Sequence, residues 1–145
     1  MNWKQRVEKF DPKINRANWK KNGSWDLEPD FISWESSGLS CVMIRHDHGA
    51  WCGYVGVNKH HPKFSSNYDE IEVDVHGGLT YSDVLPQMHN DLIYFGFDCC
   101  HCDDFTPTWP FSYLRIGATS GDSYKDVTYV RNQVASLAKQ LKDMI

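Results

Sequence analysis

The sequence predicts an α+β fold, in which an antiparallel or mixed β-sheet carries a long C-terminal helix on one face and is preceded by a short N-terminal helix. Two observations predict this class. Short apolar and β-branched runs, separated by turn-forming residues, fill the middle of the chain, and an amphipathic helical pattern ends it. The 145 residues suffice for one domain that buries its own core. This single domain, 1–145, divides into a helix with an irregular covering segment (1–30), the sheet with its site loops (31–117) and the C-terminal helix (123–145).

The first 30 residues are expected to cover the core. Apolar residues recur at helical spacing between Trp3 and Phe10, which predicts a short helix over 2–10. The rest of this segment is rich in turn formers. We therefore expect irregular structure there, with buried indole rings at Trp19 and Trp25.

The middle of the chain contains the predicted strands. Leu39–Arg45 and Trp51–Val57 are apolar runs, and the turn-like His46–Gly49 between them predicts a β-hairpin. Phe31–Trp34 precedes the hairpin as a short strand. From Ile71 to His76, apolar and polar residues alternate, which is the period-two pattern of a half-buried strand.

Three further elements complete the prediction for this region. Residues 81–90 are expected to form a helical turn that is broken at Pro86. Leu92–Cys99 is an apolar strand, and Tyr113–Ile116 is a small edge strand.

The C-terminal helix is predicted from its periodicity. From Tyr124 onward, apolar residues recur at spacings of three and four, which marks one buried face. Ser123–Asp126 resembles an N-terminal capping arrangement. The apolar face consists of Val127, Val130, Val134, Leu137, Leu141 and Ile145.

Composition and charge narrow the functional classes. A formal net charge of -4 argues against a duplex nucleic-acid binder, whose affinity would come from clustered Lys and Arg. The chain has no apolar run of membrane-spanning length, and its first residues lack the apolar core of a signal peptide. We therefore expect a cytoplasmic protein with no membrane partner. Its 5 cysteines, an odd number, fit reduced thiols better than a disulfide framework.

The sequence from Asp74 to Thr80 is the first half of the predicted site. The expected strand ends at His76, and Gly77 and Gly78 then allow a sharp turn in which backbone N–H groups can approach a ligand closely. Thr80 adds a hydroxyl group. The alternative interpretation is a simple turn that a histidine caps.

A second polar cluster, Asp98, His101 and Asp104, follows the next apolar strand. If the two strands are neighbours that point the same way, the clusters meet at one edge of the sheet. Imidazole beside carboxylate suits proton transfer, and glycine N–H groups with a hydroxyl suit a phosphate. We therefore expect a pocket for a small phosphate-containing molecule, with His61 and Tyr54 as further ligand-binding residues.

A divalent metal and a thiol nucleophile are alternatives at the same pocket. Carboxylates and imidazoles are suitable ligands for a divalent ion, although their spacing does not specify one. These ligands would be Asp98, His101, Asp104 and His76. In the thiol alternative, Cys52 or Cys99 attacks the substrate beside a histidine.

Structural zinc is a further alternative that the sequence does not favour. Cys99–Cys102 contains a C-x-x-C spacing, but the chain has no second C-x-x-C or H-x-x-x-H motif to complete a zinc site. Two histidines from elsewhere would have to complete it, chosen from His46, His48, His60 and His61.

Four motifs follow one another in a fixed order: Trp51-Cys52-Gly53-Tyr54-Val55, His61-Pro62, Asp74-Val75-His76-Gly77-Gly78-Leu79-Thr80, and Gly96-Phe97-Asp98-Cys99 with His101. Together they resemble a family of small proteins of uncharacterised function encoded by phages, prophages and bacteria. The resemblance covers roughly residues 43–107 and the final helix. In the family pattern a single aspartate lies three residues after the histidine, which corresponds to Asp104 after His101. Cys102 and Asp103 stand where small residues are usual in the family.

The resemblance implies a setting but no mechanism. Phage origin implies the host cytoplasm and interference with host defence, for example with a nucleotide immune signal. We weigh three functions: a hydrolase acting on a phosphate-containing small molecule such as a nucleotide, a non-enzymatic protein that sequesters such a signal, and an inhibitor of a macromolecular partner. A homo-oligomer is compatible with each. The site residues are His76, His101, Asp98 and Asp104 for catalysis, and Gly77, Gly78, Thr80, His61 and Tyr54 for ligand binding.

Overall fold

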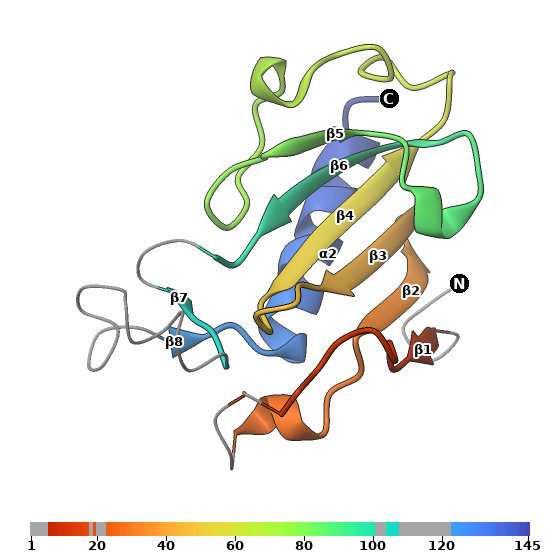
Figure 1. Ribbon diagram of the computed structural model, residues 1–145. Coiled ribbons are helices and arrows are strands. Elements are labelled where there is room, and N and C mark those ends of the chain that lie inside the picture. Colours follow the sequence, from red (N-terminus) through yellow and green to blue (C-terminus); the bar gives the residue numbers. More distant parts are fainter. Residues whose placement is uncertain (1–5, 18, 20–22, 101–103, 108–122) are drawn as a thin grey trace.

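The computed structural model describes residues 6–17, 19, 23–100, 104–107 and 123–145, with the backbone alone at 104, 105 and 123. Its centre is a six-stranded antiparallel sheet in the order β1-β2-β3-β4-β6-β5 (Figure 1). The strands are β1 (Val7–Lys9), β2 (Phe31–Ser36), β3 (Leu39–Arg45), β4 (Trp51–Val57), β5 (Tyr81–Asp83) and β6 (Ile93–Asp98).

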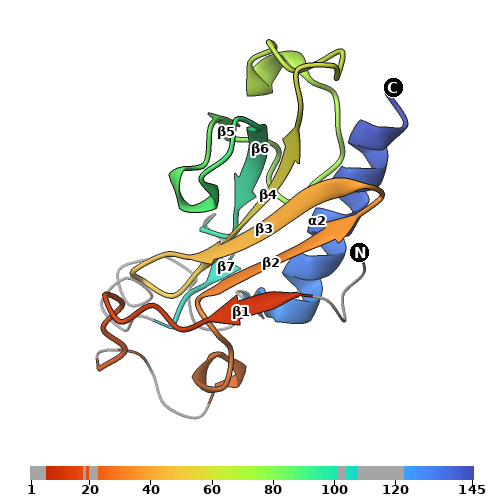
Figure 2. The ribbon, with the colours of Figure 1, turned by 90° about the vertical axis from the view of Figure 1, so that its right-hand side faces the viewer.

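Helix α2 (Val127–Lys142) lies across one face of this sheet, as Figure 2 shows from the side. A short parallel pair, β7 (Asp104–Phe105) and β8 (Ser123–Tyr124), precedes the helix. The connections that the structure describes contain three 3-10 turns: η2 (Ser24–Asp26), η3 (Tyr68–Glu70) and η4 (Pro86–Met88). The antiparallel sheet and the long C-terminal helix confirm the predicted α+β class. No helix in the described part of the chain is long and apolar enough to cross a membrane.

The predicted hairpin is confirmed. β3 and β4 pair antiparallel from Ser40–Gly56 to Arg45–Trp51. In the turn between them, the His46 N–H donates to the Ala50 carbonyl at 2.7 Å. Gly49 has a φ of 97°, and a Cβ there would lie 2.5 Å from Pro107, so both its conformation and its surroundings require glycine.

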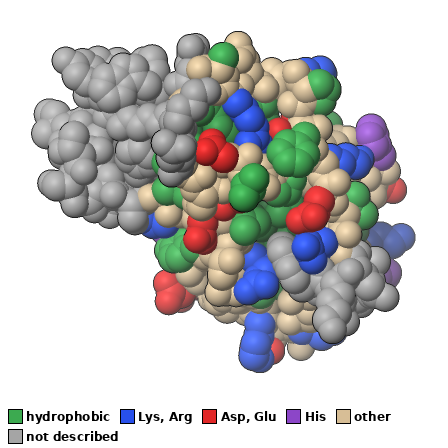
Figure 3. All heavy atoms as spheres, turned by 90° about the horizontal axis from the view of Figure 1, so that it is seen from below, with side chains coloured by type: hydrophobic (Ala, Val, Ile, Leu, Met, Phe, Trp, Pro, Cys, Tyr) green, Lys and Arg blue, Asp and Glu red, His purple; other side chains and the backbone are tan. Residues whose placement is uncertain are grey.

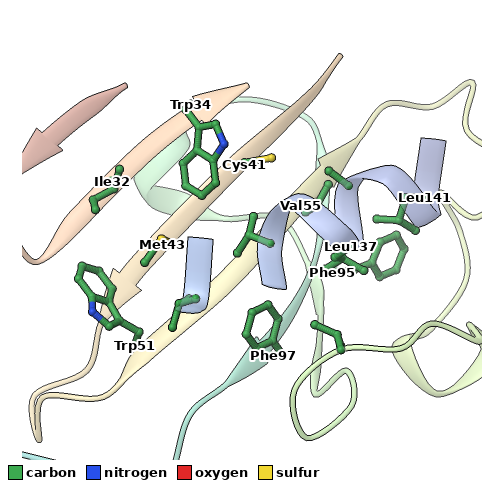
Figure 4. Close-up of a cluster of buried hydrophobic side chains, with 14 of the residues drawn as sticks. Ile32, Trp34, Cys41, Met43, Trp51, Val55, Phe95, Phe97, Leu137 and Leu141 are labelled. Atoms are coloured by element: carbon green, nitrogen blue, oxygen red, sulfur yellow. The ribbon is translucent and has the colours of Figure 1, made fainter. Parts of the chain in front are cut away.

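The main hydrophobic core lies between the sheet and α2. Alternate strand residues such as Met43, Val55 and Phe95 point toward the helix, and Phe95 lies beside Leu137 and Leu141 (Figure 4). Burial of each such side chain contributes about 1.5–3 kcal/mol. The helical periodicity predicted most of this face correctly, since Val130, Val134, Leu137 and Leu141 are fully buried, whereas Ile145 lies beyond the end of α2 and is 71% exposed.

Gly53 lets the helix approach the sheet closely. It lies in the middle of β4 on the face that α2 covers. A Cβ at Gly53 would lie 2.6 Å from both the Phe97 ring and a methyl group of Val134. The helix therefore packs directly on bare strand backbone at this point.

The prediction of a short N-terminal helix is wrong for the described residues. Residues 7–9 form β1 and pair antiparallel with β2, from Val7–Ser33 to Lys9–Phe31. The apolar spacing was misleading because Val7 and Phe10 are 49% and 62% exposed, so they form no buried helical face. The predicted burial of Trp19 and Trp25 is confirmed.

The predicted strand over 71–76 is also wrong, although its alternation is real. Ile71 and Val75 are buried against the core, but the segment belongs to no β-ladder. Its backbone is bonded to α2 instead, because the Asp74 N–H donates to Gln140 Oε1 and the His76 N–H donates to Gln133 Oε1, both at 2.8 Å. Gln140 Nε2 donates in return to the Asp74 carbonyl, also at 2.8 Å.

Two boundaries differ from the prediction. The helical turn expected over 81–90 is shorter than predicted, because residues 81–83 form β5 beside β6 and the 3-10 turn η4 begins at Pro86 and is not broken there. The C-terminal helix begins at Val127 and not at Tyr124, since the carboxylate of Asp126 caps it by accepting the Tyr129 N–H at 2.9 Å. The predicted edge strand over 113–116 lies outside the described residues.

Candidate functional site

The glycine turn after His76 has the predicted sharp geometry. Gly77 and Gly78 have φ values of 68° and 78°, and the Gly78 N–H donates to the Val75 carbonyl at 2.9 Å. A Cβ at Gly78 would meet no atom within 4 Å. Backbone conformation, and not crowding, is therefore what favours glycine at Gly78.

His76 is held by two side chains of α2. Its backbone N–H donates to Gln133, and its Nδ1 lies 2.8 Å from Tyr129 Oη, with the two rings edge to face at 5.4 Å and 89°. Lys125 Nζ lies 5.8 Å from the centre of the Tyr129 ring. An imidazole, a phenol and an ammonium group are therefore gathered beside the glycine turn.

Sequence reasoning missed Tyr129, Gln133 and Lys125. Tyr129 is 53 residues from His76, and no short motif links positions so far apart. The available signal was the spacing of four between these three residues, which places Tyr129 and Gln133 on one side of the helix. Only the packing of residues 71–76 against α2 shows that Tyr129 and Gln133 contact His76.

Thr80 and Asp98 lie together, as the predicted meeting of the two clusters requires. Thr80 Oγ1 donates to Asp98 Oδ2 at 3.3 Å, and the other carboxylate oxygen accepts the Cys100 N–H at 3.1 Å. The Thr80 N–H donates to the Gly96 carbonyl. Thr80 is therefore bonded within the protein through both its hydroxyl and its amide, as Gly78 is through its N–H.

His76 and Asp98 are directed to different faces of the sheet. Phe97 and Cys99, the neighbours of Asp98, pack into the core under α2, so the alternation of β6 turns the Asp98 side chain toward the other face. His76 instead bonds to Tyr129, on the helix. The imidazole of His76 thus contacts Tyr129, whereas the carboxylate of Asp98 contacts Thr80 and Cys100.

The remaining catalytic candidates lie partly outside the described residues. His101 is not described. Asp104 is described by its backbone alone, in β7, where it pairs with Ser123. The catalytic roles predicted for His101 and Asp104 stay predictions.

His61 and Tyr54 are placed by contacts within the fold. The His61 ring is buried, with Nε2 2.8 Å from the Leu141 carbonyl and Nδ1 accepting the Lys63 N–H at 2.9 Å. His61 therefore ties its loop to the last turn of α2. Tyr54 lies on the face of the sheet opposite α2, in edge-to-face contact with Tyr81 at 5.3 Å.

The geometry does not favour a thiol nucleophile at Cys52 or Cys99. Cys99 is buried in the core under α2. Burial raises the pKa of the Cys52 thiol far above its ordinary value, and the nearby Cys100 and Asp98 raise it further. A thiolate, the reactive form, is therefore disfavoured at Cys52.

One group of side chains among the described residues is arranged as metal ligands could be. One ligand atom from each of His46, His48 and Cys100 lies within 4.8 Å of the other two. Asp98 and His76, which the sequence offers as metal ligands, do not belong to this group.

No patch of a single charge sign stands out among the described side chains on the face drawn in Figure 3. Acidic and basic side chains are interspersed there around a few hydrophobic ones.

Comparison of the chain with protein-family models, with curated proteins and with solved structures gives no match. The functional argument therefore depends on the side chains around His76.

Proposed function

We propose that the protein hydrolyses a phosphate-containing small molecule, such as a nucleotide, beside the glycine turn at His76. The observation that supports this is the 2.8 Å contact between His76 Nδ1 and Tyr129 Oη. A hydrogen bond at one ring nitrogen holds an imidazole in one orientation, which is a usual preparation for proton transfer.

The neighbouring groups suit an anionic substrate. Lys125 supplies a positive charge close to Tyr129, and the left-handed turn at Gly77 and Gly78 lets a ligand approach the backbone without Cβ interference. In the proposed reaction, water attacks phosphorus and the bond from phosphorus to the leaving oxygen breaks. His76 accepts a proton from the attacking water and passes it to the leaving oxygen, and Lys125 offsets the charge of the phosphate.

Incubation of the protein with a panel of cyclic and linear nucleotides, followed by chromatography, tests this proposal. The resemblance to phage proteins motivates the cyclic nucleotides, since a signal of host defence would be of this class. We expect a cleaved product from at least one compound. His76→Ala should lower turnover by about 10²–10⁴-fold, the usual contribution of a general acid or base.

Two variants separate the roles of the neighbours. Tyr129→Phe removes the hydroxyl that orients His76 and should mainly lower kcat, whereas Lys125→Met should mainly raise KM. His60→Ala is the matched control, because His60 is an exposed histidine on another loop.

Each other outcome selects a different function. An intact nucleotide that is retained and then released on denaturation would replace hydrolysis by sequestration. Neither binding nor cleavage of any compound would favour action on a macromolecular partner and would overturn both small-molecule hypotheses. Equal turnover by the wild type and folded His76→Ala would exclude His76 as the catalytic residue.

A further inference from the structure

The turn of the β3–β4 hairpin and the end of β6 bring three strong metal ligands together. His46 and His48 lie in the turn, with their rings stacked at 4.8 Å and 9° between the ring planes. Cys100 follows β6, and its Sγ lies 3.5 Å from His48 Nε2. Two segments about 50 residues apart in the chain therefore converge on one point.

The backbone on both sides of this point is well supported. The turn is closed by the bonds from His46 N–H to the Ala50 carbonyl and from Gly49 N–H to the His46 carbonyl, at 2.7 and 2.9 Å. On the other side, the Cys100 N–H donates to Asp98 Oδ1 at 3.1 Å. His46 and Cys100 are thus positioned by backbone hydrogen bonds that do not use their side chains, and His48 lies within the turn that these bonds close.

The distances fit a tetrahedral ion. Zinc–nitrogen bonds of about 2.0–2.1 Å and zinc–sulfur bonds of about 2.3 Å separate neighbouring ligand atoms by about 3.3–3.6 Å. The 3.5 Å between His48 Nε2 and Cys100 Sγ already has this value. His46 has only to turn inward from within 4.8 Å, and because it is exposed, little packing opposes that rotation.

We propose that His46, His48 and Cys100 bind one zinc ion. Two imidazole nitrogens and a thiolate are borderline and soft ligands, which favour Zn²⁺ over Mg²⁺ or Ca²⁺. Three protein ligands leave a fourth position for water, as in catalytic zinc sites. Asp98 is a positioning residue in this proposal, since it holds the backbone of Cys100 and is not itself a ligand.

This site is independent of the proposed hydrolysis at His76, and its test needs no substrate. The full chain is stripped with a chelator and titrated with Zn²⁺ against a chromophoric competitor, and Co²⁺ serves as a spectroscopic probe. We expect one equivalent of zinc, and with Co²⁺ a thiolate charge-transfer band together with the intense visible bands of tetrahedral geometry.

Ligand variants and matched controls identify the residues. His46→Ala, His48→Ala and Cys100→Ser should each weaken zinc binding at least tenfold, and Cys100→Ser should abolish the charge-transfer band. His60→Ala and His76→Ala should bind zinc as the wild type does. Circular dichroism of each apo-variant ensures that a loss of binding is not a loss of folding.

Three results would overturn the zinc site. One is the absence of stoichiometric binding to the wild type at micromolar zinc. Another is a charge-transfer band that persists in Cys100→Ser, which would assign the thiolate to a different cysteine. The third is equal weakening of zinc binding by His60→Ala and His48→Ala.

Discussion

Arg45 and Glu28 form a buried ion pair, with 3.2 Å between Arg45 Nη2 and Glu28 Oε1 and with side chains that are 0% and 8% exposed. Arg45 also donates to the carbonyls of Gly49 and Pro29, at 2.8 and 3.0 Å. Glu28 Oε2 accepts the N–H of Val127, the first residue of α2, at 3.2 Å. The pair therefore joins the N-terminal covering segment, the hairpin and the start of the helix.

Arg45→Met should destabilise the protein by about 3–5 kcal/mol, because it leaves the Glu28 carboxylate buried without its cation. Urea unfolding at neutral pH measures the change. The exposed pair Lys139–Asp143, at 3.1 Å, gives the matched control, and Lys139→Met should cost no more than about 1 kcal/mol. Similar costs for the two variants would show that Arg45 does not stabilise the fold through this buried network.

Gln133→Ala and Gln140→Ala should loosen the segment 71–76 from the helix. Each removes the acceptor of one backbone N–H, that of His76 or Asp74, so the cost should be about 1 kcal/mol. Hydrogen exchange should become faster at that same amide. Gln87→Ala, on the exposed η4, is the control, and unchanged exchange at His76 in Gln133→Ala would contradict the contact.

His61→Ala should destabilise the protein by about 2–3 kcal/mol, whereas His60→Ala should change its stability by less than about 0.5 kcal/mol. His61 is buried and bonded through both ring nitrogens, to the Leu141 carbonyl and the Lys63 N–H, while its neighbour is exposed. Thermal or urea unfolding of the two variants measures the difference. Equal stabilities would refute a structural role for His61.

Alkaline pH should destabilise the fold through Cys41. Burial raises the pKa of this thiol from 9.0 to about 12, so above about pH 9 the unfolded chain releases a proton that the folded chain keeps. Stability must then fall as pH rises, and for a pKa difference of this size the loss reaches about 2 kcal/mol by about pH 10.5.

Cys41→Ala removes this proton linkage. The stability advantage of the wild type over the variant should therefore shrink by about 2 kcal/mol between about pH 8 and about pH 10.5, in urea unfolding series at matched ionic strength. An advantage that is constant across this range would show that the thiol of Cys41 titrates normally in the folded protein.

Local signals predicted the hairpin and the helix. The apolar runs of β3 and β4 and the turn at His46–Gly49 are encoded within a few residues of each other. The buried face of α2 likewise follows from its own spacing. By contrast, the alternation over 71–76 shows only that one side is buried, and it does not reveal that glutamine side chains bond this backbone.

The candidate site was harder to predict because its partners are distant in sequence. The glycine turn and its histidine are visible as a motif, but the contact with Tyr129 depends on how the helix docks. The same is true of the group formed by His46, His48 and Cys100, since the C-x-x-C spacing drew attention to Cys99 and not to Cys100. The order of the strands in the sheet brings such distant residues together.

The bare backbone at Gly53 has a consequence for the proposed chemistry. Any larger residue there would push α2 outward at Val134, which lies next to Gln133 in the chain. Tyr129 and Gln133 would move with the helix, and their hydrogen bonds to His76 would lengthen. The lack of a Cβ at Gly53, in the middle of the sheet, thus determines how accurately the distant imidazole of His76 is positioned.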